Sequence, residues 1–315
     1  MRLAAIDIGT NTVRLKVCDL VDQRLNVVAR GMEITRLGYK VNEEKRLDDR
    51  AVERTTDVLA RFKRDIDTLK TDKYMVVATS AVRDATNRGD FVDHVKETTG
   101  LDVRIITGSE EARLSYVGAT TGAPFTVADR DVVVIDIGGG STELILGSGT
   151  RYKVAKSINI GSVRLTEMFV ASDPPTGTEI ASIRQHIKRR IDRVIGQVRQ
   201  DTTGMMLVGV AGTITTIVAV RESMTVYDPD KVHLSKLVLK DMEDVLKKFT
   251  GVDMEDRRRI PGLEPKRADV IIAGVLIAIE VMRGLKSRDM IVSESDILDG
   301  AMWSLVNDSL GRGGK

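Results

Sequence analysis

Two stretches of equal length decide the fold of this chain: Leu3–Leu15, which reads LAAIDIGTNTVRL, and Val132–Leu144, which reads VVVIDIGGGSTEL. They align without a gap, so that Asp7 corresponds to Asp136. Each consists of an apolar run, Asp-Ile-Gly, a polar turn and a second apolar run. The β-branched residues favour strands and the Gly and Asn residues suit a turn, so each stretch predicts a β-hairpin. Their positions near the starts of the two halves predict a duplicated domain.

Strands and helices alternate beyond the hairpins, in the same order in both halves. A third strand, Leu25–Arg30, follows the first hairpin, and Asp48–Leu69 has apolar residues at helical spacing. The alternation predicts α/β domains with parallel or mixed sheets. The further predicted elements are strands at Tyr74–Thr79, Val103–Ile106 and Met206–Val210, and helices at Gly89–Thr98, Gly177–Gln200, Ile214–Arg221, Leu237–Thr250 and Ala268–Leu285.

The domain boundary is predicted near Pro124, between the two repeats. We expect an N-terminal domain of residues 1–123, completed by about residues 300–315, and a second domain of residues 124–299. No low-complexity linker separates them.

The bulk composition is that of a globular protein. The chain has 315 residues, of which 42% are hydrophobic and 30% charged, with a net charge of +2. This balance argues against a stable nucleic-acid complex, and no apolar run reaches the ~20 residues of a membrane span. The N-terminus enters the first motif at once and Cys18 is the only cysteine, so we expect no signal peptide and a cytoplasmic location. The basic runs Lys188–Arg190 and Arg257–Arg259 are either part of a polyanion groove or solvated helix faces.

Glycines and small polar residues fill the two predicted turns. Gly138, Gly139 and Gly140 leave backbone N–H groups accessible because no Cβ covers them. Successive N–H groups in a turn form an anion-binding nest. Two such turns facing across a cleft would hold successive phosphates of a chain, whereas two tight turns without a ligand are the alternative. Side-chain donors are expected from Asn11, Thr12, Ser141 and Thr142.

Standard nucleotide-binding patterns do not occur in the sequence. It has no Gly-x-x-x-x-Gly-Lys-Ser/Thr loop, and Gly138–Gly140 does not have the spacing of a dinucleotide fingerprint. Aromatic residues make up 3% of the chain, so no base-stacking site is evident.

The set of motifs resembles the exopolyphosphatase and guanosine pentaphosphate phosphohydrolase (Ppx/GppA) family of the actin-like ATPase superfold. The resemblance covers nearly the whole chain. It implies two actin-like (ribonuclease H-like) α/β domains, each with a mixed sheet, around a central cleft. It also implies hydrolytic release of terminal phosphate from polyphosphate or guanosine pentaphosphate. The matching stretches are Asp7–Leu15, Ala78–Asn87, Gly108–Leu114, Asp136–Glu143 and Gly161–Glu167.

The resemblance implies that Glu111 is the catalytic base. Hydrolysis of a phosphoanhydride needs a water that is placed in line and gives up a proton. Glu110 and Glu111 fall at the predicted start of a helix, where a carboxylate is also favoured by the helix dipole alone.

A second group of acidic residues is predicted to hold a metal. Glu143 resembles the second acidic residue of the family, which implies a role in holding Mg²⁺ or the attacking water. Asp7 and Asp136 are candidate metal or water ligands too, unless they only cap their own turns. Mg²⁺ prefers oxygen ligands and keeps several waters, so few carboxylates are needed. Mn²⁺ is the alternative ion.

Further phosphate ligands are predicted after two strands. Arg83 follows the strand that ends at Thr79 and would neutralise or anchor a phosphate, or else pair with Asp84 or another carboxylate. Gly212 and Thr213 begin a helix after a strand, where anions bind well. A loop of Gly161, Ser162 and Arg164 resembles the Arg83 loop in the second half.

The chain departs from the family pattern in two respects. We expect a short, two-domain form without the C-terminal domains of longer members. Ser293–Gly300 matches the family only in part, and its acidic residues suit a phosphate poorly. A phosphotransferase of the same superfold and a sensor without turnover remain alternatives. The apolar helix Ile271–Met282 is either core or the surface of a homodimer.

Overall fold

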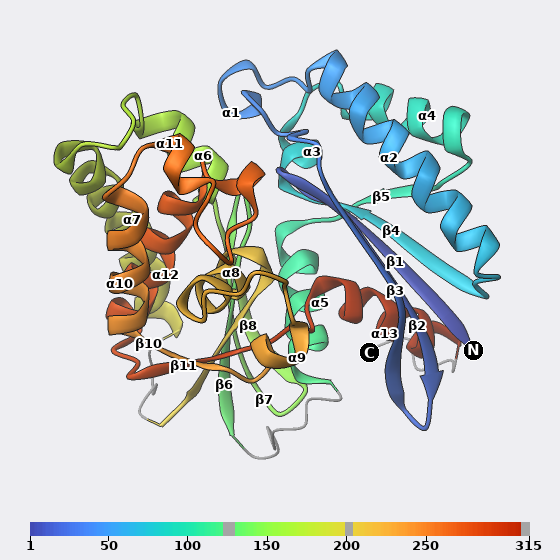
Figure 1. Cartoon of the computed structure of the whole chain (residues 1–315). Coiled ribbons are helices and arrows are strands. Elements are labelled where there is room, and N and C mark those ends of the chain that lie inside the picture. The colour runs from blue at the N-terminus through green and yellow to red at the C-terminus, as the bar shows by residue number, and fades with distance from the viewer. Residues whose placement is uncertain (122–129, 199–203, 310–315) are drawn as a thin grey trace. The chain divides into compact units, whose positions relative to one another are not determined.

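The structure of the chain is a computed structural model that describes residues 1–121, 130–198 and 204–309 (Figure 1). By its internal contacts the chain divides into two units, Met1–Thr126 with Ser295–Lys315, and Val127–Glu294. The sequence-based division had the chain return to the first domain near residue 300, and in these units the return begins at Ser295. Each unit is an α/β structure with one mixed sheet, which confirms the predicted fold class. The central cleft concerns the placement of one unit relative to the other and stays a prediction.

The described part of the first unit contains a sheet in the order β3-β2-β1-β4-β5. Strands β1, β2 and β3 are antiparallel neighbours, and β1, β4 and β5 are parallel. The predicted hairpin is therefore present as β1–β2. The elements are β1 (Arg2–Ile8), β2 (Thr12–Val21), β3 (Arg24–Ile34), α1 (Val41–Glu44), α2 (Asp49–Thr68), β4 (Lys73–Ala78), α3 (Ser80–Asp84), α4 (Arg88–Thr99), β5 (Val103–Ile105), α5 (Gly108–Thr120) and α13 (Ile297–Ser309).

Strand β1 is buried on both faces, which explains its continuous apolar run. Side chains alternate across a strand. Ala4 and Ile6 accordingly join a core with α2, and Leu3 and Ala5 join a second core with the C-terminal helix α13. The unit therefore has helices on both faces of its sheet, and the hairpin turn lies at the end of a strand fixed from both sides.

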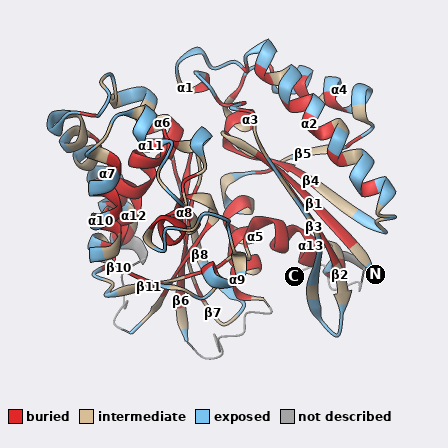
Figure 2. Ribbon diagram, in the orientation of Figure 1, coloured by how far each residue is buried: buried red, intermediate tan, exposed pale blue. Residues whose placement is uncertain are grey.

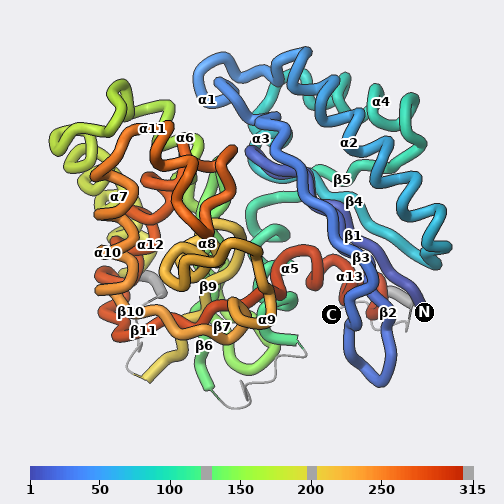
Figure 3. Tube along the Cα trace, in the orientation of Figure 1, coloured from blue at the N-terminus to red at the C-terminus, as the bar shows by residue number. Residues whose placement is uncertain are grey.

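Helix α13 returns the chain to the first unit and packs on α5 through two glycines. A Cβ on Gly118 would lie 1.7 Å from the carbonyl oxygen of Asp296, and a Cβ on Gly300 would lie 1.9 Å from that of Leu114. Figure 3 shows the red C-terminal segment beside the blue N-terminal strands. Residues from the two ends of the sequence thus pack together in the core between the first hairpin and helices α5 and α13.

The described part of the second unit repeats the topology of the first. Its sheet has the order β10-β11-β9-β6-β7-β8, in which β6, β7, β8 and β9 have the relations of β1, β2, β3 and β4. The elements are β6 (Asp131–Ile137), β7 (Thr142–Ser148), β8 (Arg151–Ile158), α6 (Ser162–Phe169), α7 (Gly177–Val198), β9 (Met206–Val210), α8 (Ala211–Arg221), α9 (Pro229–Val232), β10 (Lys236–Val238), α10 (Leu239–Thr250), α11 (Met254–Arg257), a 3₁₀ turn (Pro265–Arg267), α12 (Ile271–Leu285) and β11 (Asp289–Val292).

Helix α12 lies in the core of the second unit. Most of its residues are buried, as the burial colouring in Figure 2 shows, and it packs against α7 and α10. The apolar residues of Ile271–Met282, which the sequence assigned either to the core or to a homodimer surface, therefore pack inside this unit. They supply no argument for a dimer.

Several local predictions need correction. The segment of Arg83, which we expected to be a loop, forms the short helix α3 (Ser80–Asp84). Likewise, Ser162 begins helix α6 rather than continuing a loop. The short strands β10 and β11 and the helix α13 were not predicted, because each has few residues or a mixed pattern.

The two basic runs differ in how far their side chains are exposed to solvent. Lys188, Arg189 and Arg190 are exposed on α7, as a solvated helix face requires. Arg257, in contrast, is buried and donates to the carbonyl oxygens of Phe249, Val252 and Ala268 and to Asp173. This arginine holds together the end of α10 and the loops around it.

None of the helices in residues 1–121, 130–198 and 204–309 combines the length and hydropathy that crossing a membrane requires.

Candidate active site

The first hairpin turn is held by the segment that follows β3. The carbonyl oxygen of Thr10 accepts from the N–H of Gly38 at 2.8 Å, and that of Asn11 accepts from Thr35 and Arg36 at 3.1 and 3.0 Å. The hydroxyls of Thr10 and Ser80 share a hydrogen bond of 2.9 Å, which ties the turn to α3. The turn is therefore fixed from two directions.

The second hairpin turn is held in the same way by the start of α6. The carbonyl oxygen of Gly138 accepts from the N–H of Ser162 at 3.0 Å, and that of Gly139 accepts from Val163 and Arg164 at 2.9 and 3.1 Å. The Arg164 side chain adds a bond of 2.8 Å to the Gly140 carbonyl. The Gly161–Arg164 segment thus supports the second turn.

These contacts determine where the N–H groups of both turns point. In a planar trans peptide the C=O and the following N–H point in opposite directions. Because the carbonyls of Gly138 and Gly139 point to α6, the N–H groups of Gly139 and Gly140 point away from it. The same relation turns the N–H of Asn11 away from Gly38. Both turns therefore direct backbone donors away from their supporting segments, as an anion nest requires.

Glu111 and Arg83 form an ion pair in the first unit. Thr107 caps α5 by accepting from the N–H of Glu110, and Glu111 follows in the first turns of the helix. Nη1 of Arg83 donates to Oε2 of Glu111 at 2.9 Å and to the carbonyl oxygen of Ile106 at 3.0 Å. Glu111 is buried and Arg83 is about one-fifth exposed. The predicted base and the predicted phosphate ligand thus touch each other, although 28 residues separate them in sequence.

Two carboxylates face each other in the second unit. Asp136 of β6 and Glu143 of β7 are register partners, and both are buried. Ser157 of β8, the next register partner, donates to Oε1 of Glu143 at 2.7 Å. Like charges directly opposite each other across strands are unfavourable. Two adjoining carboxylates of this kind offer the oxygen ligands that Mg²⁺ prefers.

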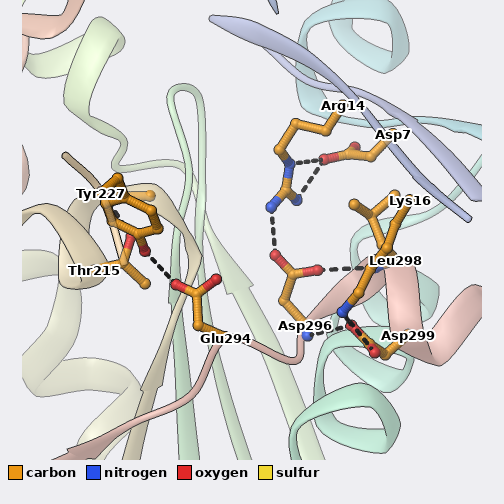
Figure 4. Close-up of polar contacts among 10 residues, drawn as sticks. Asp7, Arg14, Lys16, Thr215, Tyr227, Glu294, Asp296, Leu298 and Asp299 are labelled. Atoms are coloured by element: carbon orange, nitrogen blue, oxygen red, sulfur yellow. Dashed lines mark hydrogen bonds and ion pairs between the residues drawn. The ribbon is translucent and has the colours of Figure 1, made fainter. Parts of the chain in front are cut away.

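The matching register position in the first unit carries opposite charges. Asp7 of β1 pairs with Arg14 of β2, whose Nη2 and Nε donate to Oδ2 of Asp7 at 2.7 and 3.2 Å (Figure 4). Nη1 of Arg14 donates to Oδ2 of Asp296. Lys16, two residues further along β2, donates to both oxygens of Asp299 at 2.8 and 2.7 Å. The first repeat therefore continues into a buried ionic network.

The buried carboxylates of this network differ in the direction of their pKa shifts. Burial raises the pKa of Asp7 above its ordinary value, although Arg14 acts in the opposite direction. Burial also opposes the ionisation of Asp296, but the charges of Arg14 and Lys16 outweigh it and lower the pKa of Asp296. The two carboxylates that share Arg14 therefore have pKa values shifted in opposite directions.

Each unit, taken by itself, carries buried carboxylates of the kind that bind Mg²⁺. Oδ1 of Asp7 is buried and has no hydrogen-bond partner, so it lacks the compensation that a cation would provide. Asp136 and Glu143 supply two adjoining carboxylates. Mg²⁺ commonly takes one or two protein carboxylates together with water and substrate phosphates. In the part of the chain that the structure describes, no group of three or more His, Cys, Asp or Glu side chains is placed to hold a metal.

Three predicted phosphate ligands have structural contacts within the second unit. The hydroxyl of Thr142 donates to the carbonyl oxygen of Ile160 at 2.7 Å, and that of Thr213 donates to the Ile137 carbonyl at 3.4 Å. Gly212 gives space to a side chain, since a Cβ there would lie 2.2 Å from Nη1 of Arg267. These contacts join β7 and α8 to their neighbours and explain the residue types without a ligand.

The predicted residues therefore assemble into two groups. In the first unit, Asp7 and the Asn11–Thr12 turn lie at the end of β1, and the Thr10–Ser80 bond connects that turn to the helix of Arg83, the partner of Glu111. In the second unit, Asp136, Glu143 and the Gly138–Ser141 turn lie together at the end of β6. The approach of one group to the other stays a prediction.

Sequence reasoning missed four charged residues: Arg14, Lys16, Asp296 and Asp299. A signal was present on β2, where Arg14 and Lys16 alternate with the apolar Val13, Leu15 and Val17 and so lie on one face of the strand. Their acidic partners are 282 and 283 residues away, which no local pattern indicates.

Comparison with known proteins gives consistent matches over the full chain. The profile of the Ppx/GppA phosphatase family matches residues 16–308. The chain is 37% identical to Exopolyphosphatase 2 of Mycobacterium tuberculosis over 323 aligned residues, which cover 97% of this chain and 98% of that protein. The crystal structure of the Aquifex aeolicus member of the Ppx/GppA protein family aligns with a TM-score of 0.81 and 34% identity, covering 100% of this chain and 99% of that chain. An exopolyphosphatase-like protein aligns with a TM-score of 0.91 and 32% identity over 98% of each chain.

Proposed function

Because the chain belongs to the Ppx/GppA phosphatase family, we propose that it is an exopolyphosphatase, which releases terminal phosphate from inorganic polyphosphate by hydrolysis. The observation that carries this proposal is the Arg83–Glu111 pair. It joins a carboxylate that can accept a proton to a guanidinium that can bind phosphate, beside a turn with outward N–H groups.

Glu111 accepts the proton of the attacking water in the proposed reaction. The bonds from Arg83 and the helix cap at Thr107 restrict the carboxylate before substrate arrives. Arg83 also binds a non-bridging oxygen of the terminal phosphate, where charge is concentrated in phosphoryl transfer. The same arginine thus orients the base and the substrate relative to each other.

In the proposed complex, the two hairpin turns bind phosphates of the polyphosphate substrate through their backbone N–H groups. The N–H groups of Asn11 in one unit and of Gly139 and Gly140 in the other point away from the segments that hold the turns. Ser141 and Thr12 lie at the ends of the same turns and add hydroxyl donors. Because such contacts recognise phosphate and no base, they suit a repeating polyanion.

Mg²⁺ is the proposed cofactor, and the candidate protein ligands are Asp7 in the first unit and the Asp136–Glu143 pair in the second. The ion would neutralise charge on the phosphate oxygens. Chelation with EDTA should therefore abolish turnover, and added Mg²⁺ or Mn²⁺ should restore it. Turnover that persists after exhaustive chelation would contradict the metal requirement.

Phosphate release from polyphosphate by the wild type and by Glu111→Gln tests the proposed function. We expect the variant to lose about 10²–10⁴-fold in rate, the usual contribution of a general base. Glu110→Gln is the matched control, because Glu110 lies one residue away and pairs with the exposed Arg104. Its rate should stay near that of the wild type, since exposed pairs contribute little.

The same assay separates the proposed substrate from its relatives. Short and long polyphosphate, guanosine pentaphosphate, and polyphosphate with ADP are offered in parallel. Release from polyphosphate alone supports the proposal. Preferential hydrolysis of guanosine pentaphosphate, or formation of ATP from ADP, would replace it with that activity.

A further inference from the structure

The acidic start of α13 faces two cations of β2 in the interior of the first unit. Asp7, Asp296, Asp299 and Lys16 are each more than nine-tenths buried, and Arg14 is about one-fifth exposed. The network thus sets three carboxylates against two cations, which leaves one negative charge in excess. An excess of buried negative charge is unfavourable unless a cation or a proton joins it.

Arg14 donates hydrogen bonds to both Asp7 and Asp296. This division determines which carboxylate oxygen of Asp7 lacks a hydrogen-bond partner. A guanidinium commonly binds one carboxylate through two parallel bonds that use both oxygens. Here Nη1 of Arg14 is turned to Asp296, and the two bonds to Asp7 end on the same oxygen, Oδ2. Oδ1 of Asp7 is left buried without a hydrogen bond. Figure 4 shows Arg14 between the two carboxylates.

The position of Asp296 is itself fixed by local contacts. Its Oδ1 accepts from the N–H of Leu298 at 3.0 Å, and its own N–H donates to Asp299 at 3.2 Å, so Asp296 caps the start of α13. Asp299 is in turn held by Lys16. The acidic residues of Ser293–Gly300, which suit a phosphate poorly, therefore pair with cations of the protein itself.

We propose that Asp296 is a positioning residue that acts through Arg14, keeping one oxygen of Asp7 available to a divalent cation. The inference rests on the proposed function, because the cation concerned is the Mg²⁺ of that reaction. Without the charge of Asp296, Arg14 is compensated by Asp7 alone, and Asp7 becomes a weaker ligand. The loss of one negative charge near the ion acts in the same direction.

The test is Mn²⁺ binding to the full chain without substrate, followed by the electron paramagnetic resonance signal of the free ion. Asp296→Asn is the chosen variant, because asparagine caps a helix about as well as aspartate does. We expect it to weaken Mn²⁺ binding by about tenfold, the lower range for losing a group that supports a metal ligand. The Mg²⁺ concentration that half-activates hydrolysis should rise by the same factor, while kcat at saturating Mg²⁺ changes less than about twofold.

Two further variants separate this role from general effects. Asp19→Asn removes a carboxylate from the same strand without touching Arg14, since Asp19 pairs with Arg2, and it should bind Mn²⁺ like the wild type. Arg14→Lys keeps the charge but lacks the planar fork that reaches two carboxylates. Asp296→Asn should therefore have little additional effect in the Arg14→Lys background.

Three results would overturn the inference: no Mn²⁺ binding by the wild type, equal binding by Asp296→Asn and the wild type, or an undiminished effect of Asp296→Asn in the Arg14→Lys background. Failure of the proposed function is recognised separately. In that case the wild type releases no phosphate from polyphosphate, while the Mn²⁺ measurements, which need no substrate, still decide the role of Asp296.

Discussion

Single residues in this protein acquire their roles from the groups that orient them. Glu111 has a helix start and an arginine, and Glu143 has an aspartate and a serine across the strands. Arg14 shows how strongly the partner matters, because the equivalent position in the second repeat is the carboxylate of Glu143. The repeat thus supplies a common frame, and one substitution in it changes an ion pair into a pair of like charges.

Glu179 provides a residue-scale test of the structure through pH. The Ser172 hydroxyl and the N–H groups of Ala171 and Thr176 donate to its carboxylate, and they lower its pKa from 4.5 to about 2. A lowered folded-state pKa means that the stabilisation is complete above the unfolded pKa and is lost as the pH falls through the folded one. A ¹³C NMR titration should show the Glu179 carboxyl ionised at pH 4, with its midpoint near 2. A midpoint near 4.5 would show that these hydrogen bonds do not persist in solution.

Elements are positioned here by close backbone contacts as much as by side-chain packing. Helix α5, which carries Glu111, meets α13 at Gly118 and Gly300, where the helices approach within the reach of a single Cβ. The hairpin turns follow the same principle, since their carbonyls are held by the chain after β3 and by α6. The positions of Glu111 and of the two hairpin turns therefore depend on the neighbouring elements that hold them.

The contact between α5 and α13 predicts a large effect from one methyl group. Gly118→Ala places a Cβ 1.7 Å from the Asp296 carbonyl oxygen, so α13 must shift, and we expect a loss of about 1–3 kcal/mol in the free energy of unfolding. Trp303 of α13 is the only tryptophan, so urea unfolding followed by its fluorescence reports on this contact. Gly89→Ala in α4 is the control. Its Cβ meets nothing within 4 Å, and a stability equal to or slightly above that of the wild type is expected. Equal stability of both variants would contradict the packing.

At the scale of the whole molecule, the first unit is built from two separate pieces of chain. Residues from Ser295 onward complete its core, so its stability depends on contacts between the ends of the sequence. The second unit is formed by one continuous segment. Both have the same strand order around their hairpins, so a single repeated motif produces two similar turns.

The buried ion pair between Lys16 of β2 and Asp299 of α13 predicts that its loss destabilises the first unit selectively. Asp299→Asn leaves Lys16 buried without its charged partner, and removing one member of a buried pair costs about 3–5 kcal/mol. Hydrogen exchange should accelerate at amides of β1, β2 and α13, while those of α12 in the second unit keep their protection. Uniform acceleration across both units would mean that they unfold together.

The sequence by itself determined the local features of this protein. The apolar runs gave the two hairpins, helical periodicity and Asp48 gave α2, and the helix start at Thr107 placed Glu111. These features depend on residues that are neighbours along the chain, so their pattern is visible in the order of amino acids. The family motifs extended that knowledge to the fold class.

Only the tertiary structure decided which polar groups meet. It paired Arg83 with Glu111, turned the hydroxyls of Thr142 and Thr213 to backbone carbonyls, and gave Asp296 a cationic partner 282 residues away. Such contacts arise from the path of the chain through space, and a carboxylate or hydroxyl has the same sequence signature whether it faces a ligand, a carbonyl or an arginine. The physical reason is that hydrogen bonds and ion pairs depend on distances of a few ångströms, which sequence separation does not encode.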